Sequence, residues 1–361
     1  MPLSTSSFDR TLPDIPWLPI FGATLFIFFA FVTITEIRLA QLGYHSTVLD
    51  SAERWAKERA RASQLGERAL ILIGGSRIQL GIDLDILRKK TGLEPVQLAV
   101  DGSSFVPILK GLADDPTIRG TVLVDYYPES VEGALSGEYG AATIFQRTFE
   151  KRAGESELFS LNHVENSLTD MLHENLRSFA DGATPLMSLQ WRIIPNEKAS
   201  QYLITLPDRS RLADYSLVPM PEFYYKRVTR NLGQEQSINL AATDIEQVLK
   251  RQVNLQQSGN NTAYVQGAKY LQKLVTAIRT RGGRVKFIAM PTSGMIREID
   301  KKRHPRESFL DVFEKEVGIS VLSSADDSVL QSFSCPDGSH LDFRDRSMFT
   351  AALAHSLGIN R

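Results

Sequence analysis

The chain has 361 residues, which is enough for one large domain or two of ordinary size. Hydrophobic residues make up 42% and charged residues 23%, as in an ordinary folded protein. The formal net charge of -1 provides no basic field, so nucleic acid is excluded as an expected partner. The single cysteine, Cys335, excludes an internal disulfide framework and a metal site built from several cysteines.

The first feature along the chain is an uncharged stretch between Asp14 and Glu36. A bilayer core of about 30 Å requires about 20 apolar residues in a helix, so we expect one transmembrane helix at residues 17–36, after an N-terminal tail at 1–16. A cleaved signal peptide would begin with a basic segment, and a buried helix would show a polar stripe; the stretch has neither. The basic residues that flank the span do not decide which side the rest of the chain occupies.

A helical pattern follows, and after it short apolar runs alternate with helical patterns. Charged and apolar residues alternate in the segment 37–66, which predicts a helical stalk or packing helix at 44–65. The next predicted elements are strands at 69–75, 95–100 and 121–127, and helices at 83–92 and 105–115. Such alternation is typical of a parallel sheet with right-handed crossovers.

The middle of the chain, at about 135–240, loses this alternation. It is polar with scattered aromatic residues, which favours an insertion or cap. The pattern then returns with predicted strands at 284–291 and 319–324 and predicted helices at 243–258, 263–281, 308–318 and 344–357. We therefore expect an α/β domain at 67–361 that contains this insertion.

In a doubly wound sheet, ligands bind outside the carboxyl ends of the strands. Ser76 follows the first predicted strand directly, and Asp337 and His340 stand in a turn-like run before the last helix. A serine nucleophile needs a base within hydrogen-bond reach; His340 can be that base and Asp337 can orient it. The backbone N–H groups of Ser76 and Gly102 can form an oxyanion hole.

Each of these residues also has a structural interpretation. Ser76 would cap the N-terminus of a helix, and Asp337 would form an Asx turn. His340 would be a loop histidine bonded to the backbone, and Gly102 would only supply a positive φ. The sequence leaves both interpretations open.

Three blocks resemble those of the SGNH (GDSL-like) hydrolases, namely ILIGGSRIQLGID, VQLAVDGSSF and PDGSHLD. The resemblance is strongest to the membrane-anchored bacterial branch, which includes O-acetyltransferases of exported polysaccharides. It implies that Ser76 is the nucleophile, Gly102 the oxyanion glycine, and Asp337 and His340 the Asp-x-x-His pair. The implied fold is a three-layer α/β/α sandwich with a five-stranded parallel sheet, which the N-terminal transmembrane helix would precede.

Two positions depart from the family pattern. The first block has Gly-Gly-Ser-Arg where the family has Gly-Asp-Ser, so Arg77 stands beside the serine. Arg77 is a candidate for binding an anionic sugar, with a surface salt bridge as the structural alternative. The family's asparagine after the third strand is not evident. Asp125 stands there instead and would repel an oxyanion, whereas the hydroxyl of Tyr126 or Tyr127 could donate a hydrogen bond to it.

The resemblance implies a membrane-anchored serine esterase or O-acyltransferase that acts on acyl esters of an exported polysaccharide or another acylated glycan. It further implies a single-pass protein of the inner membrane, with its soluble domain in the periplasm and with polysaccharide secretion proteins as possible partners. No metal or organic cofactor is implied. The alternative is a catalytically degenerate member that binds polysaccharide or scaffolds a secretion assembly.

Overall fold

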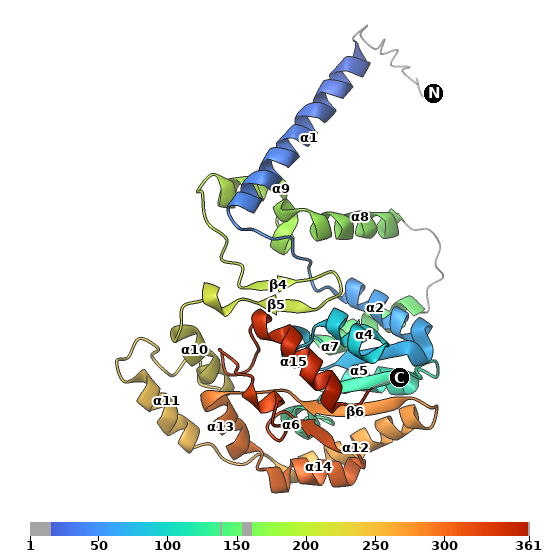
Figure 1. The fold of residues 1–361 in the computed structure, drawn as a ribbon, viewed down its shortest axis with the longest axis vertical. Helices are drawn as coiled ribbons and strands as arrows, with labels where there is room; N and C mark the ends of the chain where they lie inside the picture. The colour runs from blue at the N-terminus through green and yellow to red at the C-terminus, as the bar shows by residue number, and fades with distance from the viewer. Residues whose placement is uncertain (1–15, 138, 154–160, 360–361) are drawn as a thin grey trace, which may run out of the picture.

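The computed structural model describes residues 16–137, 139–153 and 161–359, and its centre is a five-stranded parallel sheet (Figure 1). The strands are β1 (Ala69–Ile73), β2 (Glu94–Gln97), β3 (Thr121–Asp125), β6 (Arg284–Ala289) and β7 (Val321–Ser323). Their order is β2-β1-β3-β6-β7, which confirms the predicted parallel sheet. The chain reverses its direction of winding between β1 and β3, and a crevice for ligands forms at such a point.

The two central strands are buried on both faces because helices pack against each face of the sheet. Every residue of β1 and β3 is buried, which explains why β1 is wholly apolar and why β3 is apolar at residues 122–124. On β1, Leu70 and Leu72 join one apolar cluster, whereas Ile71 and Ile73 join the other. The first cluster includes side chains of α3 (Ser76–Gly81), α4 (Leu84–Thr91) and α15 (Phe343–Ser356). The second includes side chains of α2 (Ala52–Leu65), α5 (Val106–Asp114), α12 (Asn261–Arg279) and α14 (Leu310–Val317).

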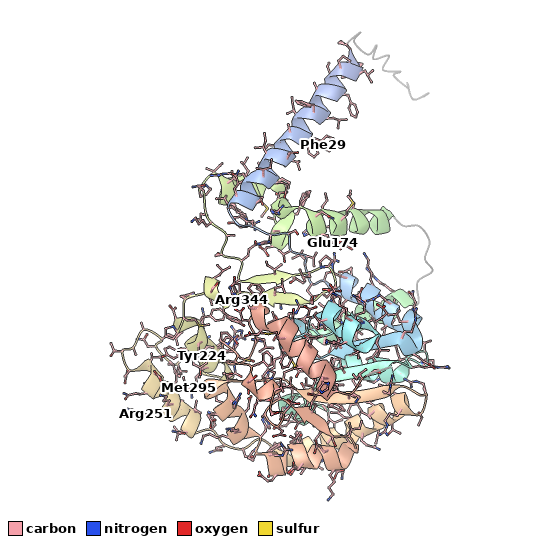
Figure 2. The ribbon with its side chains drawn as sticks, viewed as in Figure 1. Phe29, Glu174, Tyr224, Arg251, Met295 and Arg344 are labelled. Atoms are coloured by element: carbon pink, nitrogen blue, oxygen red, sulfur yellow. The ribbon has the colours of Figure 1, made fainter. Side chains whose placement is uncertain are left out.

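Helix α1 (Trp17–Gln41) extends away from the rest of the molecule, and Figure 2 shows Phe29 projecting from it. It contains the predicted segment 17–36. Among the described residues it is the one helix that is long and apolar enough, by length and composition, to cross a membrane. The helix continues past residue 36 because Leu39 is buried in a small cluster with Leu42 and Tyr44. An N-terminal membrane anchor is consistent with these features.

Helix α2 starts later than the sequence pattern indicates. It begins at Ala52 rather than near residue 44, because the Ser51 side chain accepts a hydrogen bond from the Arg54 N–H and caps the helix. The helix packs on the sheet: Trp55 is fully buried and its indole N–H donates to the Leu98 carbonyl at 2.8 Å. The predicted stalk therefore contains a helix that belongs to the main core.

The segments in the middle of the chain pack against different parts of the molecule. Helix α7 (Ala141–Ala153) packs against α2, and its buried Ala142 joins the main core. Next come α8 (Leu161–Asn175), η2 (Arg177–Gly182), α9 (Pro185–Ser188) and η3 (Leu189–Ile193), and α8 and α9 lie near the lower end of α1 in Figure 1. The antiparallel pair β4 (Leu203–Thr205) and β5 (Arg211–Ala213), η4 (Tyr215–Leu217) and α10 (Glu222–Asn231) follow.

The remaining helices connect these parts. They are η1 (Gly66–Arg68), α6 (Pro128–Glu132), α11 (Ile245–Asn254), α13 (Gly294–Arg303), η5 (Arg306–Ser308) and η6 (Leu330–Ser332). Helices α10, α11 and α13 share an apolar cluster of their own, with Val228, Leu249 and Ile296 at its centre. This cluster fixes α10 beside the loop that precedes α15, and so decides which α10 side chains reach the site described next.

Candidate active site

The structure brings Ser76, His340 and Asp337 into one hydrogen-bonded series. Ser76 is the first residue of α3, immediately beyond the carboxyl end of β1. Its Oγ lies 2.8 Å from Nε2 of His340, and Nδ1 of His340 lies 2.8 Å from Oδ2 of Asp337. Asp337 and His340 come from the loop before α15, so two loops from distant parts of the sequence meet at one edge of the sheet.

Asp337 forms a turn with the backbone and contacts the His340 ring at the same time. Asp337 Oδ1 accepts hydrogen bonds from the backbone N–H groups of Ser339 and His340 at 2.9 and 2.8 Å, as in an Asx turn. Its Oδ2 remains available to the imidazole of His340. The turn therefore fixes the carboxylate so that one oxygen holds the backbone while the other orients the ring.

Asp337 is fully buried and yet ionised at neutral pH. Burial acts to raise its pKa, but the hydrogen bond and charge of His340 and the charge of Arg227 outweigh burial and hold the pKa well below its usual range. Arg227 Nη2 lies 3.2 Å from Asp337 Oδ2. The Arg227 cation and the hydrogen bond to the His340 ring compensate this buried carboxylate, which is the condition for keeping it charged.

Two residues from the middle of the chain contribute to this environment, and the sequence analysis missed both. Arg227 comes from α10, and the buried Tyr215 comes from η4. Burial and the negative charge of Asp337 raise the pKa of Tyr215, so its hydroxyl stays protonated beside the carboxylate. No motif or spacing marks these residues, because their partner lies in a loop far along the chain.

Two backbone N–H groups at the cavity are candidates for binding an oxyanion. Neither the N–H of Ser76 nor that of Gly102 has an acceptor among the described residues. Gly102 has φ +61°, a conformation that favours glycine, and no atom lies within 4 Å of the position of a Cβ there. Both residues line the same cavity as His340.

That cavity is polar and has a volume of about 320 Å³, at the lower end of the size typical of ligand sites. Its charged and hydrogen-bonding side chains include Ser76, Arg77, Ser103, Ser104, Asp125, Tyr127, Glu129, Arg227, Asn231, Ser339 and His340. Two arginines and several hydroxyl groups around one serine suit an oxygen-rich, polar ligand better than a hydrocarbon.

Arg77 lies inside the cavity rather than on the outer surface. Its Nε donates to Ser339 Oγ at 3.3 Å, and its guanidinium lies 4.8 Å from the centre of the Tyr127 ring. No carboxylate lies within 4.0 Å of it in the described parts of the chain, so the surface salt bridge is not formed. Burial acts to lower the pKa of Arg77, but the charges of Asp300 and other nearby acidic groups raise it overall.

The segment after β3 lacks the amide donor that the resembled family has. Asp125 is buried, and burial raises its pKa to about 6, although Arg77 and the backbone N–H groups of Met290 and Gly75 act in the opposite direction. Of the two tyrosines proposed as donors, Tyr126 contacts the Tyr264 hydroxyl in the core at 2.5 Å. Tyr127 is the one that lines the cavity.

A second carboxylate lies near the serine. Asp101 precedes Gly102 and forms a 2.6 Å ion pair with Arg211 of β5. Burial acts to raise the pKa of Asp101, but Arg211, His340 and the hydroxyl of Ser76 lower it overall. Asp101 therefore adds negative charge beside the imidazole of His340.

The described residues contain no candidate metal centre and no ionised thiol. No group of three or more His, Cys, Asp or Glu side chains there could hold a metal ion. Cys335 is buried, and burial together with the charge of Asp337 raises the pKa of its thiol to about 12, so the thiol stays protonated.

Comparison of the chain with protein-family models, curated proteins and solved structures found no match. The functional proposal below therefore depends on the geometry and chemistry of the site. A hydroxyl, an imidazole, an ionised carboxylate and two free N–H groups at one cavity are the components of nucleophilic acyl transfer.

Proposed function

We propose that the protein is a membrane-anchored serine esterase or O-acyltransferase with an SGNH-like, three-layer α/β/α domain. The observation that supports this most directly is the series Ser76–His340–Asp337, with 2.8 Å at each of its two side-chain contacts. Free serine is a poor nucleophile, and an oriented imidazole at this distance is what activates it. A serine that only capped a helix would need no such partner.

In the proposed reaction, Ser76 Oγ attacks the carbonyl carbon of an acyl ester while His340 Nε2 takes the hydroxyl proton. The tetrahedral intermediate collapses, the ester bond breaks, and His340 returns the proton to the leaving alcohol. Water or a sugar hydroxyl then attacks the acyl-enzyme and gives its proton to His340. The bond to Ser76 Oγ breaks and the serine recovers its proton, so enzyme and charges are restored.

The N–H groups of Ser76 and Gly102 would bind the oxyanion of both tetrahedral intermediates. Each such donor contributes roughly 3–4 kcal/mol in a site that excludes water. Asp125 cannot replace the family's asparagine because a carboxylate repels an oxyanion, whereas the hydroxyl of Tyr127 lines the same cavity. Asp337 would stabilise the imidazolium that forms in each step.

The proposed substrate is an acylated glycan, most simply an exported polysaccharide. The polar cavity, with Arg77 and Arg227 in its lining, suits sugar hydroxyl groups and an anionic substituent. The apolar helix α1 supports a single-pass anchor, for which we propose the inner membrane with the domain in the periplasm. Proteins of polysaccharide secretion would then be neighbours.

The test is ester hydrolysis by the full chain in detergent, with para-nitrophenyl acetate as substrate. We expect Ser76→Ala to lose the activity, by about 1,000-fold or more, because it removes the nucleophile. Ser104→Ala is the matched control, since Ser104 lines the same cavity but its hydroxyl accepts from the Val106 N–H. Equal rates in the wild type and Ser76→Ala would remove the catalytic proposal.

One observation favours a second candidate, a degenerate relative that binds polysaccharide without turnover. Because Asp125 stands where the resembled family has an amide donor, the site has one hydrogen-bond donor fewer for the oxyanion. Labelling with a fluorophosphonate, which forms a covalent bond with an activated serine hydroxyl, separates the two. Modification of Ser76 supports the enzyme, whereas an unmodified wild type that retains acylated glycan on an affinity column supports the binding protein.

A further inference from the structure

Large apolar side chains are exposed on the short helices α9 and η3. Leu186 is 70% exposed, Trp191 57% and Ile194 70%. They belong to a ten-residue segment, 185–194, which we call the α9–η3 segment. Figure 1 shows α9 beside the lower end of α1, and η3 contacts both α1 and α9. Three large apolar groups on so short a segment are unusual for a surface that faces only water.

Helix α1 is clamped to this part of the molecule rather than joined to it by a free linker. Leu39 of α1 is fully buried and packs in one cluster with Ile193 of η3. The Glu36 carboxylate accepts hydrogen bonds from the backbone N–H groups of Arg177 and Ser178, each at 2.8 Å. The hydrogen bonds fix η2, and the packing of Leu39 on Ile193 fixes η3, at one height along the axis of α1.

That height corresponds to the boundary of a bilayer. The uncharged stretch of α1 ends at Thr35, and a helix rises about 1.5 Å per residue. Leu39 therefore lies about 6 Å beyond the last residue of the stretch, within the polar interfacial layer that borders the hydrocarbon core. Ile193, in the same cluster as Leu39, and its neighbour Trp191 would lie at about this level. Tryptophan is the residue most characteristic of that layer, since its ring is apolar and its N–H is polar.

We infer that the α9–η3 segment is a second membrane contact, which lies in the interfacial layer of the bilayer that α1 crosses. Its partner is the lipid itself, at the boundary between headgroups and acyl chains. The inference rests on the proposed anchor function of α1. One crossing helix alone leaves the whole protein free to turn about the helix axis and to tilt in the membrane, whereas a second contact holds the cavity of the proposed active site at one height and orientation over the membrane surface.

Site-directed fluorescence in nanodiscs tests this contact on the full chain. Cysteine is introduced at Ile194, and the natural Cys335 is buried, so the unsubstituted chain serves as the labelling blank. An environment-sensitive fluorophore on the new thiol is then quenched by lipids that carry a spin label near the headgroup. The matched comparison is Leu255→Cys, an equally exposed apolar position at the end of α11. Figure 2 shows Arg251 of α11 at the lower left of the molecule, far from Phe29 of α1 in the upper part.

We expect quenching of the Ile194→Cys label to exceed that of the Leu255→Cys label at least twofold. A label on Phe29→Cys, in the middle of α1, tests separately whether α1 lies in the membrane. Its fluorescence should be quenched by lipids that carry the spin label deep in the acyl chain. If Phe29→Cys is quenched and Ile194→Cys is no better quenched than Leu255→Cys, the second contact is wrong while the anchor stands. If Phe29→Cys is not quenched, both are wrong. The fluorescence emission of the Ile194→Cys label could also be blue-shifted without being quenched by lipid. That result would mean that a protein surface covers the segment, which also overturns the inference.

Discussion

The guanidinium of Arg227 lies 3.2 Å from the carboxylate of Asp337 and joins α10 to the loop before α15. Asp337 is fully buried, whereas Arg227 reaches the cavity and is partly exposed there. The middle of the chain, which is polar and irregular in sequence, therefore supplies a charge that helps keep the proposed orienting carboxylate ionised.

Replacing Arg227 should weaken catalysis through Asp337. We expect Arg227→Met to lower kcat/KM for a chromogenic ester by about 10- to 100-fold, since a hydrogen bond to a charged group contributes about 1.5–3 kcal/mol. The acid limb of the pH–rate profile should move to higher pH, because loss of the cation beside Asp337 makes it easier to add a proton to the coupled Asp337–His340 pair. Arg227→Lys should recover part of the rate.

Arg230→Met is the control for this variant, because Arg230 lies on the same helix and, within the part of the chain that the structure describes, its side chain pairs only with the exposed Glu235. It should leave the rate and the pH profile unchanged. An Arg227→Met enzyme with a lower rate but an unmoved acid limb would show that Arg227 acts on the substrate instead of on Asp337.

The buried Asp125 should make the protein less stable as pH rises. Its pKa is about 6 in the folded state and 3.8 when unperturbed, so the folded state binds more protons between these values. The free energy of unfolding should then fall by about 2 kcal/mol from pH 4 to pH 6.5 through this group alone. Urea unfolding at several pH values, compared between the wild type and Asp125→Asn, isolates the effect. Parallel curves for the two proteins would mean that Asp125 is not protonated at pH 4.5–6.

Two glycines at the site should differ in their tolerance of a side chain. A Cβ at Gly74 would lie 2.5 Å from Cβ of Asp125, whereas a Cβ at Gly102 would meet nothing within 4 Å. Both have positive φ, so each alanine variant carries backbone strain of about 1 kcal/mol. Gly74→Ala should lose a further 1–3 kcal/mol or so through overpacking, which differential denaturation in urea measures. Equal losses in the two variants would contradict the close approach of Gly74 to Asp125.

Arg209 should be the residue through which the middle of the chain is most firmly attached to the sheet. It is fully buried, and it donates to Asp50 at 2.7 Å, to the Gln97 carbonyl at 2.5 Å and to the Ala99 carbonyl at 3.1 Å. Arg209→Met removes three hydrogen bonds and leaves Asp50 without its cation, so the free energy of unfolding should fall by about 3–5 kcal/mol.

The exposed Arg230 again provides the comparison. Arg230→Met breaks an ion pair in solvent and should change the free energy of unfolding by less than about 1 kcal/mol. A similar small change for Arg209→Met would show that the contacts of Arg209 with the loop after β2 do not hold the middle of the chain in place.

The five strands were predictable because each contains buried apolar residues, such as Ile71 in β1 and Phe287 in β6, that leave a local trace in the sequence. The start of α2 was not predicted correctly, because the helical pattern extends upstream of Ser51. The cap at Ser51 decides where the helix begins. The continuation of α1 beyond residue 36 was missed for a related reason. Leu39 and Glu36 find their partners in η2 and η3, which are distant in sequence.

By itself the sequence determined the apolar first helix, the alternation of strands and helices, and the three residues Ser76, Asp337 and His340. These features are local: periodicity, caps and short motifs depend on neighbours a few positions away. Only the tertiary structure decided that Arg227 and Tyr215 surround Asp337, and that α9 and η3 lie against the end of α1. Such contacts depend on how the helices and strands pack in three dimensions. The sequence around each residue therefore carries no pattern that would identify its partner.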